Sequence, residues 1–572
     1  MNIKQILQQQ FAKAIKEEFN ISMEPEDIHL ERPQDESHGD WSSNIGFILG
    51  KQISQDPYTV AQRINHRLTH PLIYRKKTIN GFANIHLQTE HYIDTLVEIL
   101  KENKKYGTNS RLKDKRLMVE FAHPNPFKAF HIGHLRNIIL GESLVRLLES
   151  QGAKVIRTNY QGDVGMHIAK NIWAFKKIDP KDYPETTDER VTLLGKLYAE
   201  GATAFEENDQ AQSEIREINK KIYSKEDPEI NKLWDLGKKW SLEKFHEIYE
   251  RVYTNFDREY METETLDTCM KHVERALKKG ILEKSQGAII FNGEPHGLDT
   301  RVFVNSEGLP TYEGKELGLA YMEFKDFGEL DLLIYNVAVE HNSFYQVTFK
   351  VKELLDPKLF KGKQYHNAYE FVGLKGGKMS SRKGNVVLGD EILTQAHNRI
   401  EKIVKEKSKV ENIDEISEII GIGAVKCSFL RISPFKYLAF DLEESLNFEG
   451  DSGPYLQYTY ARAKSILREV GEQKPKKIPA DTLTSDHEIA LLKWLERFPE
   501  VVEIASSEYT PNDICTYLFE LAQRFNSFYK QHQVLKAERE EDKLARLALT
   551  QATSIVIEKG LDLLGIKTVE KM

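Results

Sequence analysis

The sequence predicts an α/β protein whose central domain is a Rossmann-type parallel sheet, split by a helical insertion. From Lys115 onward the patterns read strand, polar loop, helix and strand: R-L-M-V-E-F, the loop, I-I-L-G-E-S-L-V-R-L-L-E-S-Q-G and A-K-V-I-R-T-N-Y. This is the βαβ unit from which parallel sheets are built. Charged helical patterns then occupy about 175–280, and strand-like runs return at 287–291, 301–304 and 331–339. We expect these runs to complete the sheet.

Two further domains flank this one. Residues 1–112 combine helical patterns with an alternating stretch at 78–87 that begins with an Asn-Gly turn, which predicts a small α+β domain. After residue 390 the patterns are almost wholly helical, with a loop at 471–481 and a helix start at T-P-N-D, residues 510–513. The predicted domains are therefore 1–112, 113–390 with its insertion, and an all-α bundle at 391–572.

Composition limits the class of protein. A chain of 572 residues is too long for one core. No apolar run reaches the roughly 18 residues of a membrane span, and the N-terminal stretch lacks a signal-peptide cleavage site, so we expect a cytoplasmic protein. The net charge of −8 does not favour a polyanion globally, although 80 Lys and Arg allow local basic surfaces. Cys269, Cys427 and Cys515 lack zinc-ligand spacing, which predicts buried apolar cysteines and no metal site.

The loop after the first strand of the βαβ unit carries unusually many polar groups: F-A-H-P-N-P-F-K-A-F-H-I-G-H-L-R-N, residues 121–137. Such a loop lies at the carboxyl edge of a parallel sheet, where the N–H groups of a helix N-terminus can hold a phosphate. His131 and His134 can donate to phosphate oxygens, and Gly133 permits close backbone approach. By itself H-I-G-H also fits a metal pair or incidental surface histidines, although no further ligands lie nearby. His123 is assigned no role.

A second basic loop, G-G-K-M-S-S-R-K-G-N-V-V at 376–387, follows the predicted sheet. Its glycines allow movement, while Lys378, Arg382 and Lys383 can bring positive charge onto a triphosphate. Alone it fits an ordinary solvated basic turn. The presence of both loops in this order makes coincidence improbable.

Together H-I-G-H and K-M-S-S-R resemble the signature of class I aminoacyl-tRNA synthetases. Further segments resemble the arginyl-tRNA synthetase family in particular, and the resemblance extends from near residue 30 to the C-terminus. These segments are V-E-F-A-H-P-N-P-F-K (119–128), N-Y-Q-G-D-V-G-M-H (159–167), F-D-R-E-Y-M-E-T-E (256–264), L-P-T-Y-E-G-K-E-L-G (309–318), G-P-Y-L-Q-Y-T-Y-A-R (453–462) and L-D-L-L-G-I (561–566).

The resemblance implies that arginine and ATP form arginyl-adenylate and pyrophosphate, and that the arginyl group then passes to the 3′ end of tRNA(Arg). His131 and His134 would stabilise the reacting α-phosphate, and Lys378 the departing pyrophosphate. Ser380 and Ser381 would complete the ATP-binding loop. Since Ser381 replaces the lysine common there, its work would fall to Arg382 or to Lys128. Magnesium would accompany ATP without a dedicated protein cage.

For the amino acid, the resemblance implies that Glu120 and Asn125 hold the α-amino and α-carboxyl ends, while Tyr312 and Glu316 frame the guanidinium. The family usually has aspartate at Glu316 and glutamine near Glu340 and His341, so we expect a slightly reshaped arginine pocket that includes Glu340. Glu120 also fits an ordinary edge-strand acid, and Tyr312 a core aromatic.

For tRNA, the resemblance implies that the N-terminal domain contacts the D-loop and the C-terminal bundle the anticodon. Phe82 and Asn84 fit the first role, whereas the second would be served by Tyr455, Gln457, Tyr458, Arg462 and the terminal Met572. Tyr455 and Tyr458 fit the bundle core equally well. We expect a monomer that binds neither DNA nor membranes.

Three other readings remain. A class I synthetase for another amino acid is the nearest, although cysteine specificity would require a zinc cluster that three scattered cysteines cannot build. A small-molecule nucleotidyltransferase would leave the terminal domains without a purpose. A tRNA-binding protein without catalysis is disfavoured by the intact His131, His134 and Lys378.

Overall fold

The computed structural model describes residues 3–376, 387–407, 411–471, 475 and 477–572. The chain forms two compact units. The first unit comprises Met1–Asn103, Gly471–Glu496 and Ser527–Ala552, and the second comprises Lys104–Val470, Arg497–Asn526 and Thr553–Met572. The boundaries predicted near residues 112 and 390 divide the chain by its sequence patterns, whereas these units divide it by its contacts. The predicted boundaries stay predictions.

The first unit contains a three-stranded antiparallel sheet in the order β1-β3-β2 (Trp41–Ser43, Phe82–Leu87, Ile73–Ile79). Asn80 and Gly81 join β2 to β3 with φ values of 49° and 89°, as the Asn-Gly signal predicts. Lys493 and Asp40 form an ion pair of 2.6 Å within this unit. Its helices are α1 (Ile3–Phe19), α2 (Ile45–Ile53), α3 (Pro57–Arg67), α4 (Thr89–Glu102) and α18 (Asp486–Glu496), and α20 (Pro511–Gln531) and α21 (Glu540–Leu563) contribute residues to both units.

The second unit is built on a five-stranded parallel sheet in the order β11-β10-β4-β5-β6. The strands are β4 (Arg116–Glu120), β5 (Lys154–Gln161), β6 (Arg258–Met261), β10 (Leu332–Ala338) and β11 (Gln364–Tyr369). Helix α5 (Ile132–Ser150) connects β4 to the parallel strand β5. The predicted βαβ unit and the return of the sheet at 331–339 are therefore confirmed.

The prediction that 287–291 and 301–304 also complete this sheet is wrong. These residues form β8 (Ala288–Phe291) and β9 (Arg301–Val304), which join β7 (Glu283–Ser285) in a separate antiparallel sheet. The physical reason lies in the connections. Gln286 and Gly287, both at positive φ, make a two-residue hairpin, whereas parallel neighbours need a crossover of a dozen or more residues.

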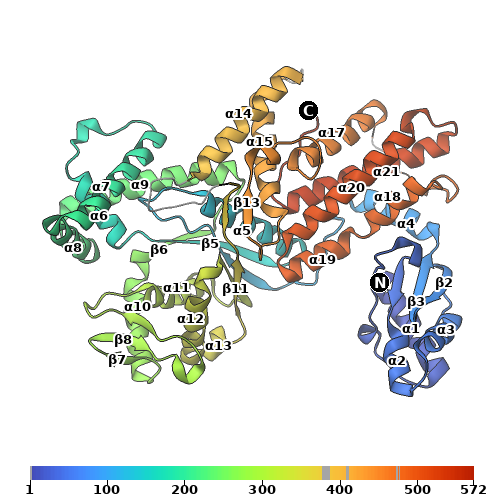
Figure 1. Ribbon diagram of the computed structural model, residues 1–572, viewed down its shortest axis with the longest axis horizontal. Helices are drawn as coiled ribbons and strands as arrows, with labels where there is room; N and C mark the ends of the chain where they lie inside the picture. The colour runs from blue at the N-terminus through green and yellow to red at the C-terminus, as the bar shows by residue number, and fades with distance from the viewer. Residues whose placement is uncertain (1–2, 377–386, 408–410, 472–474, 476) are drawn as a thin grey trace. The chain divides into compact units, whose positions relative to one another are not determined.

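The helices of the insertion form a group of their own, at the left of Figure 1. They are α6 (Met166–Phe175), α7 (Thr187–Glu207), α8 (Asp209–Ser224) and α9 (Pro228–Arg251). A buried apolar cluster that includes Phe175, Ile215 and Trp240 holds them together. The range 175–280 also contains β6, which belongs to the parallel sheet; this four-residue strand is too short to give a clear alternating pattern.

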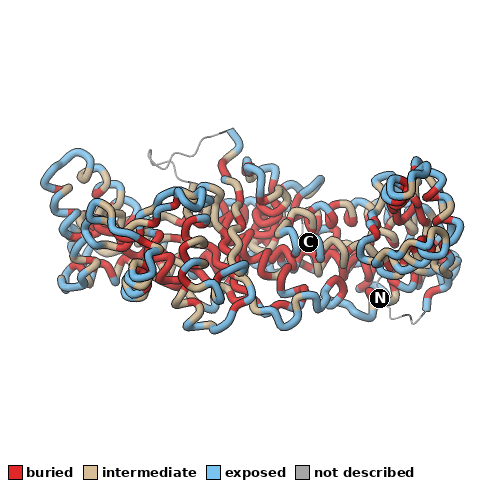
Figure 2. The backbone as a smooth tube through the Cα atoms, turned by 90° about the horizontal axis from the view of Figure 1, so that it is seen from below, coloured by how far each residue is buried: buried red, intermediate tan, exposed pale blue. Residues whose placement is uncertain are grey.

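One face of the parallel sheet packs in a buried cluster with Met118, Tyr335 and Tyr345. Figure 2 shows that the tube is mainly red through this central region. The remaining elements of the unit are helices and two short paired strands: α10 (Glu262–Lys278), α11 (Tyr312–Phe327), α12 (Asn342–Leu355), α13 (Pro357–Phe360), β12 (Val372–Leu374), α14 (Gly389–Lys407), α15 (Ile413–Leu430), β13 (Leu438–Phe440), α16 (Leu442–Ser445), α17 (Gly453–Val470) and α19 (Phe498–Glu508).

Two local predictions are confirmed. Helix α20 begins at Pro511, and all three cysteines are free and buried.

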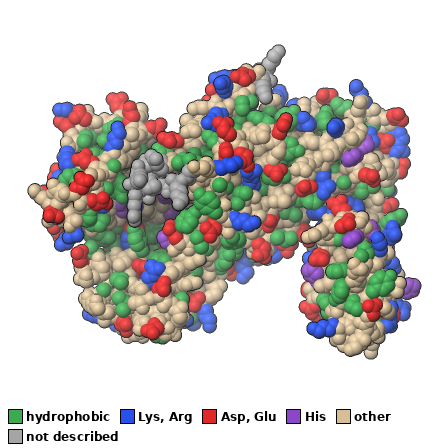
Figure 3. Space-filling model, viewed as in Figure 1, with side chains coloured by type: hydrophobic (Ala, Val, Ile, Leu, Met, Phe, Trp, Pro, Cys, Tyr) green, Lys and Arg blue, Asp and Glu red, His purple; other side chains and the backbone are tan. Residues whose placement is uncertain are grey.

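On the face seen in Figure 3, basic and acidic side chains are interspersed. Among the described residues, no helix is long and apolar enough to cross a membrane.

Candidate active site

The sheet has one topological switch point, between β4 and β10. From β4 the chain proceeds outward through β5 to β6, whereas β10 lies on the other side of β4 and is followed outward by β11. Ligands of open parallel sheets bind outside the carboxyl ends of the strands at such a point. The loop after β4 carries His123 to His131, and the short helical turn Val339–His341 follows β10. The sequence-predicted residues therefore meet where this fold places a ligand.

His131 and His134 form a reciprocal cap at the start of α5. The His131 ring Nδ1 accepts a hydrogen bond from the Gly133 N–H at 3.1 Å, and the His134 Nδ1 accepts one from the His131 N–H at 3.2 Å. The rings stack with centroids 3.8 Å apart. Because each Nδ1 is an acceptor, the proton of each neutral ring resides on Nε2. Both imidazoles can therefore offer Nε2–H groups as donors.

Both histidines are neutral at ordinary pH. Burial lowers the pKa of His131 to about 4, with a smaller effect from Lys128, and burial lowers the pKa of His134 well below its usual value. Burial also lowers the pKa of Lys128. Gly133 is required for a steric reason as well, since a Cβ there would lie 2.9 Å from Cε1 of the His131 ring.

The last residue of the basic loop, Val387, and the residues that follow it lie beside the turn that carries His131 and His134. The Ile132 N–H donates to the Val387 carbonyl at 3.0 Å, and the Gly389 N–H donates to the Phe130 carbonyl at 2.8 Å. Five predicted residues lie outside the described residues: Lys378, Ser380, Ser381, Arg382 and Lys383. The described flank from Val387 to Gly389 lies against the histidine turn.

Arg136 supports this arrangement and was not singled out in the sequence. Its buried guanidinium donates to the carbonyls of Phe371 at 2.8 Å, Lys436 at 3.0 Å and Pro434 at 3.2 Å. It thereby ties the helix that begins at the histidines to the segments that precede the paired strands β12 and β13. A basic residue just after H-I-G-H was the available signal, but a surface arginine gives the same pattern.

Asn125 connects the loops after β4 and β5, because its Oδ1 accepts a hydrogen bond from the Gly162 N–H at 2.8 Å. The same loop is strained, with Ala122, His123 and Phe127 at φ values of 79°, 52° and 65°. Strained backbone of this kind concentrates at functional sites.

The structure divides the predicted arginine-binding residues into two groups. Glu120 and Glu316 are buried in one cluster, where Glu316 pairs with Lys352 at 2.9 Å. Tyr312, in contrast, is 66% exposed at the start of α11 with the Lys315 ammonium over its ring. Glu340 is also exposed, beside His341. Sequence reasoning missed Lys352 and the neighbouring Glu323.

The predicted tRNA-binding residues have partners within their own units. In the first unit, Phe82 packs edge-on against the exposed Phe47, whereas Asn84 is buried. In the second unit, Gln457 is buried and donates to the Ile419 and Lys567 carbonyls. Their contacts with tRNA stay predictions.

Asn526 is the shared partner of two other predicted tRNA-binding residues. It receives a hydrogen bond from Arg462 and donates one to the Tyr455 hydroxyl, and Arg462 also reaches the Tyr458 hydroxyl. Met572 is partly exposed at the C-terminus. Contacts of these residues with tRNA also stay predictions.

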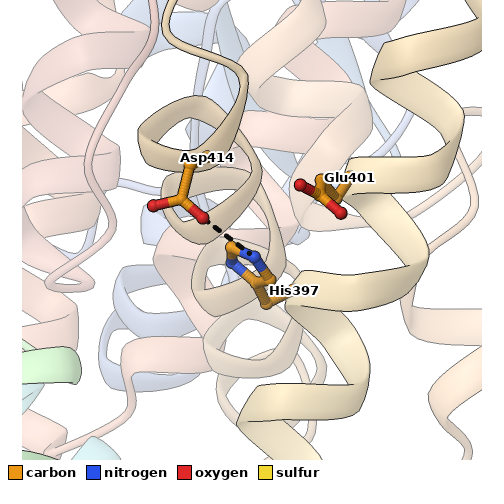
Figure 4. A group of neighbouring side chains, drawn as sticks. All are labelled: His397, Glu401 and Asp414. Carbon is orange, nitrogen blue, oxygen red and sulfur yellow. Dashed lines mark ion pairs between the residues drawn. The ribbon is translucent and has the colours of Figure 1, made fainter.

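One group of three ligand-type side chains occurs among the described residues: His397, Glu401 and Asp414, with donor atoms within 4.8 Å of one another (Figure 4). Its members are already paired, since His397 contacts Asp414 and Glu418, and Glu401 contacts Lys405 at 2.7 Å. The group belongs to α14 and α15, not to the loops after β4 and β10, and we assign it no metal.

Family models of known proteins match three regions that together cover most of the chain. Family models match residues 4–87 (arginyl tRNA synthetase N terminal domain), 95–441 (tRNA synthetases class I (R), catalytic domain) and 456–572 (DALR anticodon binding domain). Arginine–tRNA ligase of Treponema denticola is 32% identical over 96% of this chain and 95% of its own length. That of Clostridium perfringens is 33% identical over 98% and 99%.

A solved structure is similar to the whole chain. Thermus thermophilus arginyl-tRNA synthetase superposes with a TM-score of 0.83 at 25% identity and covers 100% of both chains. The matched regions include the switch-point loops, both histidines and the flanks of the basic loop. The chain belongs to the arginyl-tRNA synthetase family of class I aminoacyl-tRNA synthetases.

Proposed function

We propose that this protein is an arginine–tRNA ligase. The α-carboxylate of L-arginine would attack the α-phosphorus of ATP to give arginyl-adenylate and pyrophosphate, and a terminal hydroxyl of tRNA(Arg) would then take the arginyl group and release AMP. The observation that carries the proposal is the capped pair of neutral imidazoles at the switch point, beside the flank of the basic loop.

The Nε2–H groups of His131 and His134 are suited to receive negative charge that develops on the phosphate oxygens. They are fixed by backbone hydrogen bonds and need no reorganisation during the reaction, which is the condition for strong electrostatic stabilisation. Lys128, and the loop residues Lys378 and Arg382, would add positive charge. Gly133, Ser380 and Ser381 would contact ATP.

Buried acids support a cationic amino acid as substrate. Glu120 and Glu316 lie in a buried cluster with more carboxyl groups than cations, which favours a guanidinium over a neutral side chain. Asn125, Tyr312 and Glu340 would complete the contacts with arginine.

Magnesium would enter with ATP. The carboxylates near the histidine turn are engaged: Glu262 accepts from Lys315, and Asp163 accepts from Thr263. ATP phosphates are therefore the fitting ligands, and the ion supplies charge neutralisation to them.

For tRNA, Phe82 and Asn84 would contact the D-loop, and the residues around Tyr455 to Arg462 with Met572 the anticodon. We also propose the domain boundaries 1–112, 113–390 and 391–572 and a cytoplasmic monomer that binds no DNA.

The deciding experiment offers the protein ATP, total tRNA and each amino acid in turn, and measures charged tRNA. Arginine alone should be attached; charging by another amino acid, or by none, would overturn the proposal. We also expect ATP–pyrophosphate exchange to stay near background until tRNA is added, and robust exchange without tRNA would remove that part.

A further inference from the structure

A buried cluster of three carboxyl groups lies beneath the switch point. Glu120 stands at the carboxyl end of β4, and Glu316 and Glu323 lie two turns apart on the same face of α11. Their exposed fractions are 2%, 2% and 0%, and the neighbouring Lys352 on α12 is 0% exposed. The proposed function uses Glu120 and Glu316 but leaves Glu323 unexplained.

Only one of the three acids is paired with a lysine or an arginine in the described part of the chain. The Lys352 ammonium donates to Glu316 Oε1 at 2.9 Å and to the Tyr335 hydroxyl at 3.1 Å. The carboxyl groups of Glu120 and Glu323 lie within hydrogen-bonding reach of each other. Neither Glu120 Oε2 nor either oxygen of Glu323 meets a donor among the described residues. A hydrogen bond between them therefore needs a proton that the pair itself carries.

The charge count leads to the same result. Three carboxylates and one ammonium would leave two uncompensated negative charges in a buried site, where a charge without a partner is strongly unfavourable. Carboxyl groups avoid this cost by keeping their protons. Burial, followed by the charge of Glu316, raises the pKa of Glu323 to about 8, and burial, followed by Glu323, raises that of Glu120 well above its usual range.

Other titratable groups face the pair from every neighbouring element. His123 is neutral, because burial lowers its pKa to about 4, and its Nε2 lies 4.0 Å from Glu120 Oε1 without a hydrogen-bond partner among the described residues. The negative charge of Asp326 contributes to raising the pKa of Glu323. Asp326 itself accepts a hydrogen bond from the Tyr260 hydroxyl at 2.9 Å. Burial raises the pKa of each facing tyrosine, so all stay neutral: Tyr160, Tyr260, Tyr335 and Tyr345.

We propose that Glu323 is a positioning residue for the substrate cation: with Glu120 it holds two protons in the free protein, and the pair releases one of them when arginine binds. The released proton passes to the solvent, and no other bond changes. The cluster is electrically neutral before and after, because the arriving guanidinium replaces the proton. Glu120 then faces the guanidinium and not the α-amino group that the resemblance assigns to it. This inference rests on the proposed arginine specificity, and it explains how a neutral isostere such as citrulline would be rejected.

The test is calorimetric titration of the full-length protein with arginine, in phosphate and in imidazole buffer at the same pH. At about pH 6.5 the buffer dependence of the heat should correspond to about one proton released per arginine. The release should decline towards pH 9, because the free pair has by then already lost a proton. Citrulline, whose side chain carries no charge, should release none. Arginine binding with a heat independent of the buffer would overturn the proposal, without relying on any variant.

Glu323→Gln tests the residue itself. Glutamine has nearly the same shape, but it cannot titrate, and its amide N–H donates to the carboxylate of Glu120, which favours the charged form of Glu120 and so lowers its hold on the proton. At about pH 7.5 proton release should fall well below the wild-type value, and the arginine Kd should lose its pH dependence. Glu274→Gln, an exposed change on α10, is the matched control and should behave as wild type. A Glu323→Gln protein identical to wild type would overturn the assigned role.

The two proposals fail differently. If the wild-type protein attaches no arginine to tRNA, the proposed function is wrong. If it attaches arginine but binds it without releasing a proton, only the present inference is wrong.

Discussion

His131 has two tasks that one substitution can separate. Its Nδ1 caps α5 by accepting the Gly133 N–H, and its Nε2–H is the donor proposed for the α-phosphate. Asparagine is among the best N-cap residues, so His131→Asn should keep the cap while removing the Nε2–H donor. His131→Ala removes both.

The magnitudes follow from these two interactions. Loss of one preorganised donor to a developing oxyanion typically slows the chemical step by about 10²–10³-fold, which is roughly 2.7–4 kcal/mol. Loss of an N-cap costs about 1 kcal/mol of stability. We therefore expect both variants to form arginyl-adenylate about 10²–10³-fold more slowly, whereas His131→Ala alone should lose about 1 kcal/mol of unfolding free energy.

The assay is single-turnover adenylate formation with tRNA present, together with thermal unfolding of each variant. Because His131 is neutral down to a pKa of about 4, the wild-type rate should show no change attributable to His131 between pH 5 and 8. A His131→Asn protein that keeps a rate near wild type would refute the assignment of the Nε2–H donor, since its cap is intact.

Three other predictions follow from the same structure. His134→Ala should slow adenylate formation by orders of magnitude while leaving the tRNA Kd nearly unchanged, because the donor acts on transition-state charge; equal losses in both would contradict this role. Lys352→Met should lower the unfolding free energy of the second unit by about 3–5 kcal/mol, measured by urea denaturation, because Glu316 loses its buried partner; a loss below about 1 kcal/mol would show that the pair contributes little. The pKa values of His123 and His131 are held near 4 and that of His167 near 3, so the unfolded chain binds more protons in acid. The contribution of these three histidines to stability should therefore be full above about pH 6.5 and fall between there and pH 4 by up to about 1.4 kcal/mol per pH unit for each histidine. Glu120 and Glu323, whose pKa values are raised, contribute with the opposite sign in this range, so the measurement compares the denaturation midpoint of the wild type with that of His167→Gln from pH 4 to pH 6.5, and identical pH profiles would rule this out.

Local patterns in the sequence were reliable where one segment carries its own signal. The strand, loop and helix between Lys115 and Tyr160, the Asn80-Gly81 hairpin and the helix start at Pro511 all form as predicted. The strand runs at 287–304 were identified as strands but placed in the wrong sheet. Periodicity indicates that a segment is extended, whereas its partner depends on the connection that follows.

The candidate site was predicted in part for a similar reason. Residue type and order were sufficient to single out His131 and His134, and the resemblance to the family added Glu120. The sequence could not predict the tautomers of the two imidazole rings, because each tautomer depends on the backbone N–H group from which the ring accepts a hydrogen bond. Glu323 and Arg136 were missed, since an acid or an arginine on a helix is usually a surface residue.

By itself the sequence determined the residue types at the site, the order of the helices and strands around them and the resemblance to one family, because these depend on local patterning and on motifs. Only the tertiary structure decided which charged groups lose their water. The packing of α11 and α12 against the sheet buries Glu120, Glu316 and Glu323 around a single Lys352 ammonium. Burial arises only when the faces of the helices and the sheet pack together, and it raises the pKa values of Glu120 and Glu323 so that these carboxyl groups keep their protons.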